Sequence, residues 1–281
     1  RTADTLLLTF VDGRFAPDHS TPAELWPQGL RLSNVAAALR ESRAEEALSA
    51  APAATGAFPD LNTAAFRDGA WIEVEERARI ERSVRLVFVT TRAAAPGGVH
   101  TRNLIRLNAG SSLRVTVAFT GEALAHGFST HIASAILAEG AQLELVRFQQ
   151  GPAACGHFDS LSASLASRAV LEDTLFQTGP AWTRSEIGLA LVGESCCADL
   201  GGVFLAAGRE VTDIHTTIDH EGRGVVSRQN YRGLAAEEGR GVYHGQIRVL
   251  SGARGADAVQ NNRNLLLSRR AQVHSTPALE I

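Results

Sequence analysis

The sequence predicts an all-β protein built as a parallel β-helix. From about Trp71 onward, short runs of alternating or β-branched residues replace helical periodicity, and small or polar residues separate them. A degenerate repeat of 26 to 30 residues runs through the same region. A fixed period in the range of about 20–50 residues is typical of solenoids and stacked arrays, and short strands without a helix in each repeat favour a parallel β-helix. A jelly roll or a sandwich is the alternative.

The first sixty residues differ from the rest of the chain. We predict a small N-terminal helical and mixed segment over residues 1–60, followed by the β-helix core over residues 61–281. Leu6–Val11 is a short apolar run, and the Asp12-Gly13 pair that closes it is a turn signal.

A helix is predicted next. Ser33 is a candidate N-cap for a helix over Val35–Leu48, because Val35, Leu39 and Leu48 have the spacing of one helical face. The Ala- and Pro-rich segment Ala50–Pro59 is interpreted as a linker.

Nine strands are predicted from the apolar and β-branched runs that follow. They are Trp71–Val74, Val84–Thr90, Leu104–Leu107, Leu113–Phe119, Leu143–Phe148, Ile187–Val192, Ile214–Ile218, Val242–Val249 and Val273–Ile281.

The repeat is visible at the start of several runs. Ala109–Val115 aligns with Glu139–Leu145 at an offset of 30 residues, and similar steps recur at Ser167–Val170, Gly193–Ser195 and Arg270–Val273. In a β-helix each coil stacks on the next, and polar residues at tight corners bond backbone groups that the turns leave unpaired. The polar block Gln260–Asn264 is therefore expected to occupy such a corner.

Composition and charge narrow the functional classes. A net charge of −3 argues against a general nucleic-acid binder. No stretch approaches the roughly 18 apolar residues of a membrane span, and the N-terminus does not resemble a signal peptide. Three cysteines, two of them adjacent, make a poor disulfide framework and indicate a reducing compartment. We therefore expect a cytoplasmic protein.

Catalytic and metal-binding motifs are weak. His215 and His220 are five residues apart, so on one strand they face opposite sides, and no zinc-like spacing of Cys or His is present. Of the neighbours Cys196 and Cys197, one is expected in the core and one outside. His131, His157 and Ser160 lack a nucleophile motif, and phosphate loops are missing. We predict no catalytic, cofactor-binding or metal-binding residue.

One enzyme class stays open as the alternative function. Parallel β-helices often carry carbohydrate-active hydrolases and lyases, and Asp213 with Asp219, or Asp257, are possible acid and base. The third hypothesis is a structural β-helix without an assembly role.

Eight segments form a series of motifs in a consistent order: Phe10–Pro17, Leu61–Gly69, Arg102–Ile105, Asp219-His220, Ser227–Gly233, Gly241–Ile247, Asn262–Ser268 and Pro277–Ile281. Together they resemble the SufB/SufD family of iron–sulfur cluster assembly scaffolds. Thr101 stands where this family usually has Pro, and Arg232 where Lys is common. The motif residues, expected to be structural or to lie at an interface, are Gln229, Tyr231, Gly233, Gly245, Asn262, Arg263, Asn264, Pro277 and Glu280.

The resemblance implies a right-handed parallel β-helix and a non-enzymatic scaffold. Within the family, the N-terminal features favour a SufD-like over a SufB-like protein. It implies a SufB-like partner at the C-terminal end of the β-helix. A SufC-like ATPase would bind through C-terminal helices that lie beyond Ile281, so we expect the chain to be C-terminally truncated. No cluster ligand is transferred to this chain: the complex is expected to handle the iron–sulfur cluster transiently. A coil cut at its edge exposes unpaired strand groups, so a homodimer is also expected to be possible.

Overall fold

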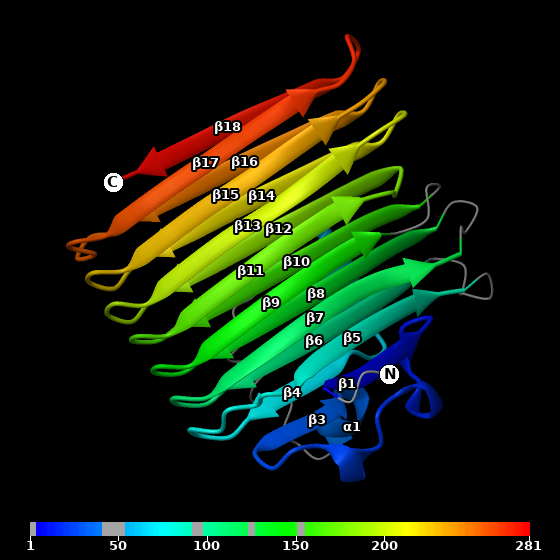
Figure 1. Cartoon of the computed structure of the whole chain (residues 1–281), viewed down its shortest axis with the longest axis vertical. Helices are drawn as coiled ribbons and strands as arrows, with labels where there is room; N and C mark the ends of the chain where they lie inside the picture. The colour runs from blue at the N-terminus through cyan, green and yellow to red at the C-terminus, as the bar shows by residue number, and fades with distance from the viewer. Residues whose placement is uncertain (1–3, 41–53, 92–97, 123–126, 151–154) are drawn as a thin grey trace.

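The structure is a two-sided β-solenoid, in which each coil contributes one strand to each of two parallel sheets (Figure 1). The computed structural model describes residues 4–40, 54–91, 98–122, 127–150 and 155–281. The coils stack in sequence order, and the two termini lie at opposite ends of the stack. The prediction of a parallel β-helix is confirmed.

Sheet A holds the odd-numbered strands and one short hairpin strand. Every pair in it is parallel except β1 with β2. Its order is β17 (Asp257–Leu266), β15 (Val226–Ala235), β13 (Cys197–Ala206), β11 (Val170–Thr178), β9 (Gln142–Gln150), β7 (Ser112–Gly121), β5 (Ser83–Thr90), β1 (Thr5–Val11) and β2 (Arg14–Phe15).

Sheet B holds the even-numbered strands and ends on β3, which pairs antiparallel with β4. Its order is β18 (Gln272–Glu280), β16 (Arg240–Val249), β14 (Val211–His220), β12 (Trp182–Leu191), β10 (Gly156–Leu165), β8 (Phe128–Leu137), β6 (Val99–Leu107), β4 (Ala70–Val74) and β3 (Leu30–Asn34).

The sequence repeat corresponds to one corner of the solenoid. Leu113 pairs with Leu143, and Leu143 with Leu171, which gives offsets of 30 and 28 residues. At this corner one residue per coil adopts a left-handed conformation, and its N–H donates to a carbonyl of the next coil. The corner residues are Arg77, Gly110, Gly140, Arg168, Ser195 and Gly224. Arg270–Val273 is the exception, because it leads into β18 of sheet B and so lies at the opposite corner.

The N-terminal residues are built into both sheets. β1 pairs in parallel with β5, and Asp12 and Gly13 form the predicted turn into β2, with φ of 48° and 75°. Two 3-10 turns, Pro17–His19 and Ala23–Leu25, lead to β3. The expected division at residue 60 falls inside the helix α3 (Ala57–Ala65).

The helix predicted after Ser33 begins at Val35, as α1 (Val35–Arg40); its expected continuation to Leu48 lies outside the described residues. Ser33 is part of β3 and does not cap it. Instead, Oδ1 of Asp68 accepts from the N–H of Ala36 at 3.1 Å. The linker prediction for Ala50–Pro59 is wrong at its end, where α3 begins, and its residues 50–53 are outside the described part.

α3 covers the outer face of sheet B. Its Phe58 ring packs between Phe128, Phe158 and Trp182, with ring centroids 4.9 to 5.5 Å apart. The main core lies between the two sheets and consists mostly of inward Leu, Val and Ile side chains. None of the helices that the structure describes is long and apolar enough to cross a membrane.

Candidate functional site: a polar interior along the solenoid

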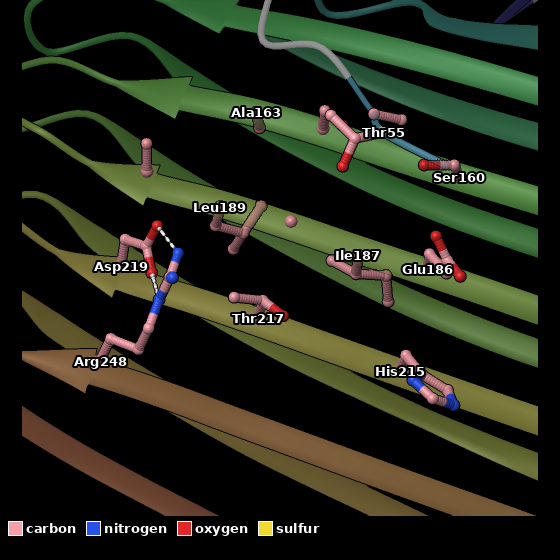
Figure 2. A pocket seen from close by; sticks show the side chains of 14 residues that line it. Thr55, Ser160, Ala163, Glu186, Ile187, Leu189, His215, Thr217, Asp219 and Arg248 are labelled. Atoms are coloured by element: carbon pink, nitrogen blue, oxygen red, sulfur yellow. Dashed lines mark hydrogen bonds and ion pairs between the residues drawn. The ribbon is translucent and has the colours of Figure 1, made fainter. Parts of the chain in front are cut away.

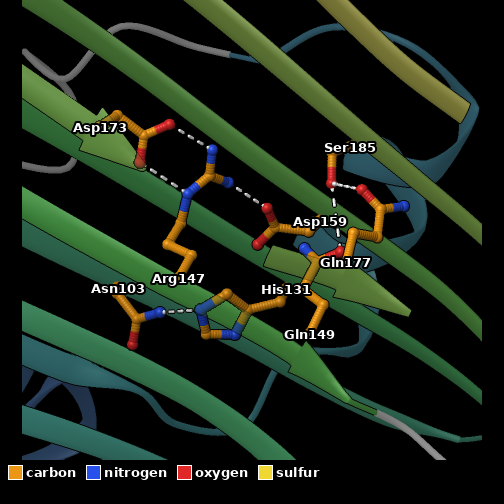
Figure 3. A network of polar contacts seen from close by, with 8 residues as sticks. All are labelled: Asn103, His131, Arg147, Gln149, Asp159, Asp173, Gln177 and Ser185. Carbon is orange, nitrogen blue, oxygen red and sulfur yellow. Dashed lines mark hydrogen bonds and ion pairs between the residues drawn. The ribbon is translucent and has the colours of Figure 1, made fainter. Parts of the chain in front are cut away.

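A buried ion cluster interrupts the apolar core in the middle of the solenoid (Figure 3). Arg147 of β9 donates from Nε to Oδ1 of Asp173 at 2.9 Å, from Nη2 to Oδ2 of the same carboxylate at 2.6 Å, and from Nη1 to Asp159. All three side chains are at most 2% exposed. One guanidinium therefore bonds to two carboxylates, and with both carboxylates ionised the cluster keeps a net negative charge inside the protein.

The protonation of the cluster follows from that imbalance. Burial raises the pKa of Asp159 to about 6, the charge of Asp173 adds to the increase, and Arg147 opposes it. Burial alone would lower the pKa of Arg147, but the charges of Asp173 and Asp159 raise it above its usual value. Arg147 is therefore always charged, whereas Asp159 takes up a proton in mildly acidic solution.

Two imidazoles lie beside this cluster. The His131 ring contacts Phe88 and Phe119, and Nε2 of His131 is 2.6 Å from Nδ2 of Asn103. Burial lowers the pKa of His131 well below its usual value, with a contribution from the charge of His157. Burial also lowers the pKa of His157 to about 4. Both rings are therefore neutral at physiological pH.

The polar interior continues through glutamines toward the C-terminal coils. Ser185 Oγ lies 3.3 Å from Oε1 of Gln149 and 3.2 Å from Oε1 of Gln177 (Figure 3). Further along, Thr216 donates to Oε1 of Gln229 at 2.6 Å. These contacts link sheets A and B across the solenoid.

Family-motif residues form the next layer of this interior. Gln229 also accepts from the hydroxyl of Tyr243 at 3.1 Å, and that hydroxyl accepts from Nε2 of Gln260 at 2.9 Å. The rings of Tyr231 and Tyr243 pack at a tilt of 36° with centroids 5.1 Å apart, and both are fully buried. Burial raises the pKa of Tyr231 well above its usual value. Within the described residues, Nε2 of Gln229 and the Tyr231 hydroxyl have no hydrogen-bond partner, so both retain capacity for one.

The motif glycines provide the space for this layer. A Cβ atom on Gly233 would overlap the Phe204 ring and Oδ1 of Asn264, and one on Gly245 would overlap the Gln260 amide. Asn264 in turn donates to Asn262. Gly233, Asn262 and Asn264 lie on the neighbouring strands β15 and β17 of sheet A, and Gly245 lies on β16 of sheet B, so the structure brings most of the motif residues together.

Three motif residues lie outside this cluster. Arg263 faces outward on β17. Pro277 of β18 pairs with Gly245, and Glu280 accepts from Nε2 of Gln246 at 2.8 Å on the outer side of sheet B. The corner prediction for Gln260–Asn264 is wrong, because the whole block lies inside β17. Its alternate residues Gln260, Asn262 and Asn264 face a polar interior rather than a turn.

A second candidate is a groove of about 440 Å³ on the outer face of sheet B (Figure 2). Glu186, His215, Asp219 and Arg248 line it, and Thr55 lies at its edge. Nε2 of His215 is 2.8 Å from Oδ1 of Asp213. As expected, His215 lies outside while His220 points into the core.

The three carboxylates that the alternative enzyme hypothesis would use as acid and base all pair with arginine side chains. Asp219 forms two bonds to Arg248, Asp257 pairs with Arg228, and Asp213 lies 3.2 Å from Nη1 of Arg184. Asp213 and Asp219 are six residues apart on one strand, or about 20 Å. That exceeds the roughly 5–10 Å between the two carboxyl groups of glycosidases.

The two adjacent cysteines have raised thiol pKa values, which disfavour the nucleophilic thiolate. Cys196 is fully buried and Cys197 is partly exposed, so the expected division between core and outside is confirmed. Burial raises the pKa of Cys196 to about 11, and burial also raises that of Cys197. Within the described residues, no group of three or more His, Cys, Asp or Glu side chains could hold a metal ion.

The family assignment comes from sequence comparison. Residues 88–281 match the model of the SUF system FeS cluster assembly SufBD core domain. The chain belongs to the SufBD family. The matched region runs from β5 to the end of β18 and contains the ion cluster and all nine motif residues.

Relatives extend the similarity over the whole chain. A SufBD family protein of iron–sulfur cluster assembly from Synechocystis sp. is 24% identical over 287 residues, which is 98% of this chain and 62% of that protein. The iron–sulfur cluster assembly protein SufD of Escherichia coli is 25% identical over 282 residues, or 100% of this chain and 64% of that protein. A chloroplastic SufBD family protein of Arabidopsis thaliana is 24% identical over 237 residues, or 80% and 42%. The chain spans less than two thirds of each relative.

Proposed function

We propose that this SufBD protein is a scaffold subunit of the SUF system for iron–sulfur cluster assembly, acting through partner proteins without a reaction of its own. The SufBD core match over residues 88–281 carries the proposal, and the SufD relative of Escherichia coli supports it. The iron–sulfur cluster would be cargo of the complex rather than a resident cofactor of this chain. A cytoplasmic location fits this role.

We place the contact with a SufB-like partner at the C-terminal end of the solenoid. The last coil continues the inward-facing rows of the core: Leu266 pairs with Ala235 and Leu279 with Ile247, and the two leucines are 51% and 60% exposed. Exposed apolar patches of this kind mark interaction surfaces, and the edges of β17 and β18 could add strands from a partner. A SufC-like ATPase is the second proposed partner.

The decisive experiment is co-expression of the full natural chain with SufB-like and SufC-like proteins of the same organism. Size-exclusion chromatography with light scattering would report the mass of the complex. We expect one species that contains all three proteins. A protein that elutes alone would contradict the scaffold role and would make a polysaccharide activity screen, for the alternative enzyme reading, the next step. A self-associated species without partners would favour the homodimer.

A point substitution tests the proposed contact surface. Leu279→Asp should lower the amount of SufB-like protein recovered in the complex, because it puts a charge into an apolar interface. Leu25→Asp is the matched control, since Leu25 is 58% exposed at the other end of the solenoid. Unchanged recovery of the SufB-like protein with Leu279→Asp would contradict the proposed contact surface. So would a lower melting temperature of the variant alone, because Leu279 would then be covered by the chain itself.

A further inference from the structure

The outer face of sheet A carries three rows of side chains across β9, β11 and β13. In strand register, Glu144, Glu172 and Asp199 form an acidic row, and Phe148, Phe176 and Val203 form an apolar row. The row between them consists of the smaller residues Val146, Thr174 and Gly201. We call this surface, made by these nine residues, the β9–β13 face. Its middle row has smaller side chains than the rows on either side; we call the outer rows the acidic ridge and the apolar ridge, and the middle row the trough.

The apolar ridge is exposed over its whole length. Phe148 is 42% exposed, Phe176 is 41% and Val203 is 37%. The two phenyl rings stack on each other with centroids 5.0 Å apart and planes 8° apart. The described helices pack elsewhere, since α1 and α3 contact strands β3, β4, β6 and β8. Contiguous exposed aromatic surface of this kind marks an interaction site.

The acidic ridge places like charges next to one another. Neighbouring strands are about 4.8 Å apart, and like charges that face each other across strands destabilise a sheet. Arg114 offsets the repulsion at Glu144, because its Nε is 2.7 Å from the Glu144 carboxylate. Glu172 lies between Glu144 and Asp199 and has no hydrogen bond or ion pair among the described residues. A cationic partner would offset this repulsion.

We propose that the β9–β13 face binds an amphipathic helix with a basic edge. A helix rises about 5.4 Å per turn, close to the strand spacing of about 4.8 Å. A helix laid along the trough would therefore place one turn over each strand. Apolar side chains at i, i+4 and i+7 would meet Phe148, Phe176 and Val203, while Lys or Arg on the adjacent edge would meet the three carboxylates.

Cationic residues limit the face at both ends. Arg114 of β7 continues the acidic row on one side, and on the other side Arg228 and Arg232 of β15 follow Asp199 and Val203. The partner helix is thus expected to make about three turns of contact. This inference does not depend on the SUF complex, because the surface lies on the sheet and away from the last coil.

A synthetic probe peptide tests the proposal on the full chain. The peptide is an amphipathic helix of about 18 residues, or five turns, with a Leu stripe flanked by Lys and a fluorescent label. Two matched peptides replace every Lys by Glu, or place Pro in the middle to break the helix. Fluorescence anisotropy would measure the Kd. We expect the Lys peptide to bind and both matched peptides to bind at least about tenfold more weakly.

Substitutions then locate the site. Glu172→Lys should weaken the Lys peptide about tenfold and strengthen the Glu peptide, because the charge of the ridge is reversed. Phe176→Ser should weaken the Lys peptide with little change in its salt dependence. Glu24→Lys and Leu25→Ser are the controls, since both residues are exposed on the 3-10 turn Ala23–Leu25 and should change nothing.

Three results would overturn the proposal. The first is equal binding of the Lys and Glu peptides, which would mean non-specific apolar adsorption. The second is equal binding of the Pro peptide, which would exclude a helical partner. The third is binding that Glu172→Lys and Phe176→Ser leave unchanged, because the peptide would then bind elsewhere. Hydrogen exchange on the wild-type chain should show peptide-dependent protection in β9, β11 and β13.

Discussion

Arg147 bonds to two buried carboxylates through one guanidinium, and this determines how much the residue contributes to the stability of the fold. The bidentate bond to Asp173 and the single bond to Asp159 satisfy most of its donors. A buried pair adds little stability relative to apolar residues of the same shape, but removal of one partner leaves an uncompensated charge. Loss of Arg147 leaves two such charges.

Arg147→Met should therefore lower the free energy of unfolding by about 3–5 kcal/mol. Urea denaturation at neutral pH would measure this loss. Arg114→Met is the control, since its pair with Glu144 is exposed to solvent, and surface pairs contribute at most about 1 kcal/mol. Equal losses in the two variants would show that the buried cluster has no special role in stability.

At the scale of elements, the motif glycines determine how β13, β15 and β17 pack. Phe204 of β13 occupies the space beside Gly233 of β15, and Asn264 of β17 fills the other side. The ring is fully buried and has little room to move. A methyl group at Gly233 must displace it.

Gly233→Ala should cost about 1–3 kcal/mol of stability, as overpacked cores do. Gly188→Ala is a matched control in the middle of β12, because nothing lies within 4 Å of the added Cβ. We expect thermal unfolding of the control to match the parent protein or to exceed it slightly. A Gly233→Ala variant as stable as the control would mean that the layer of Phe204 and Asn264 rearranges freely.

The strands show what periodicity can predict. All nine predicted runs lie in or overlap strands, because each has apolar alternation on one face. Six strands after β7 were not predicted, namely β8, β10, β11, β13, β15 and β17. β8 and β10 were missed because their residues are buried on both faces beneath α3, and Ser and Ala replace β-branched residues. β17 was missed for the opposite reason: its inward residues are polar because they face a polar interior.

Only part of the interior site could be predicted from the sequence. Strand parity already places Arg147 on the same face as Leu143 and Leu145, so a buried arginine could have been suspected. Its partners could not, because Asp159 and Asp173 lie on two other strands and their positions depend on coil length and register. The motif residues Gln229 and Tyr231 were found through the family resemblance, which does not reveal that Gln229 bonds to Thr216 and Tyr243 across the interior or that the Tyr231 ring packs against Tyr243.

For the whole molecule, the polar interior makes stability depend on pH in two opposing ways. The pKa of Asp159 is about 6 in the folded protein against 3.8 normally, so the folded state holds its proton longer. Its contribution to stability is complete below about pH 4 and is lost as the pH rises through 6. The pKa of His157 is about 4 against 6.5 normally. Stability from this neutral ring is therefore gained as the pH rises through the same range.

Asp159→Asn should separate these two effects. Without the carboxylate, the stability of the variant relative to the parent protein should rise by on the order of 2 kcal/mol between about pH 4 and 6.5. His157→Gln should change the slope in the opposite direction, because it removes the group that favours neutral pH. Urea denaturation at several pH values would give both slopes. Parallel curves for Asp159→Asn and the parent would show that both carboxylates stay ionised beside Arg147, and that this one guanidinium suffices for two charges in a dry core.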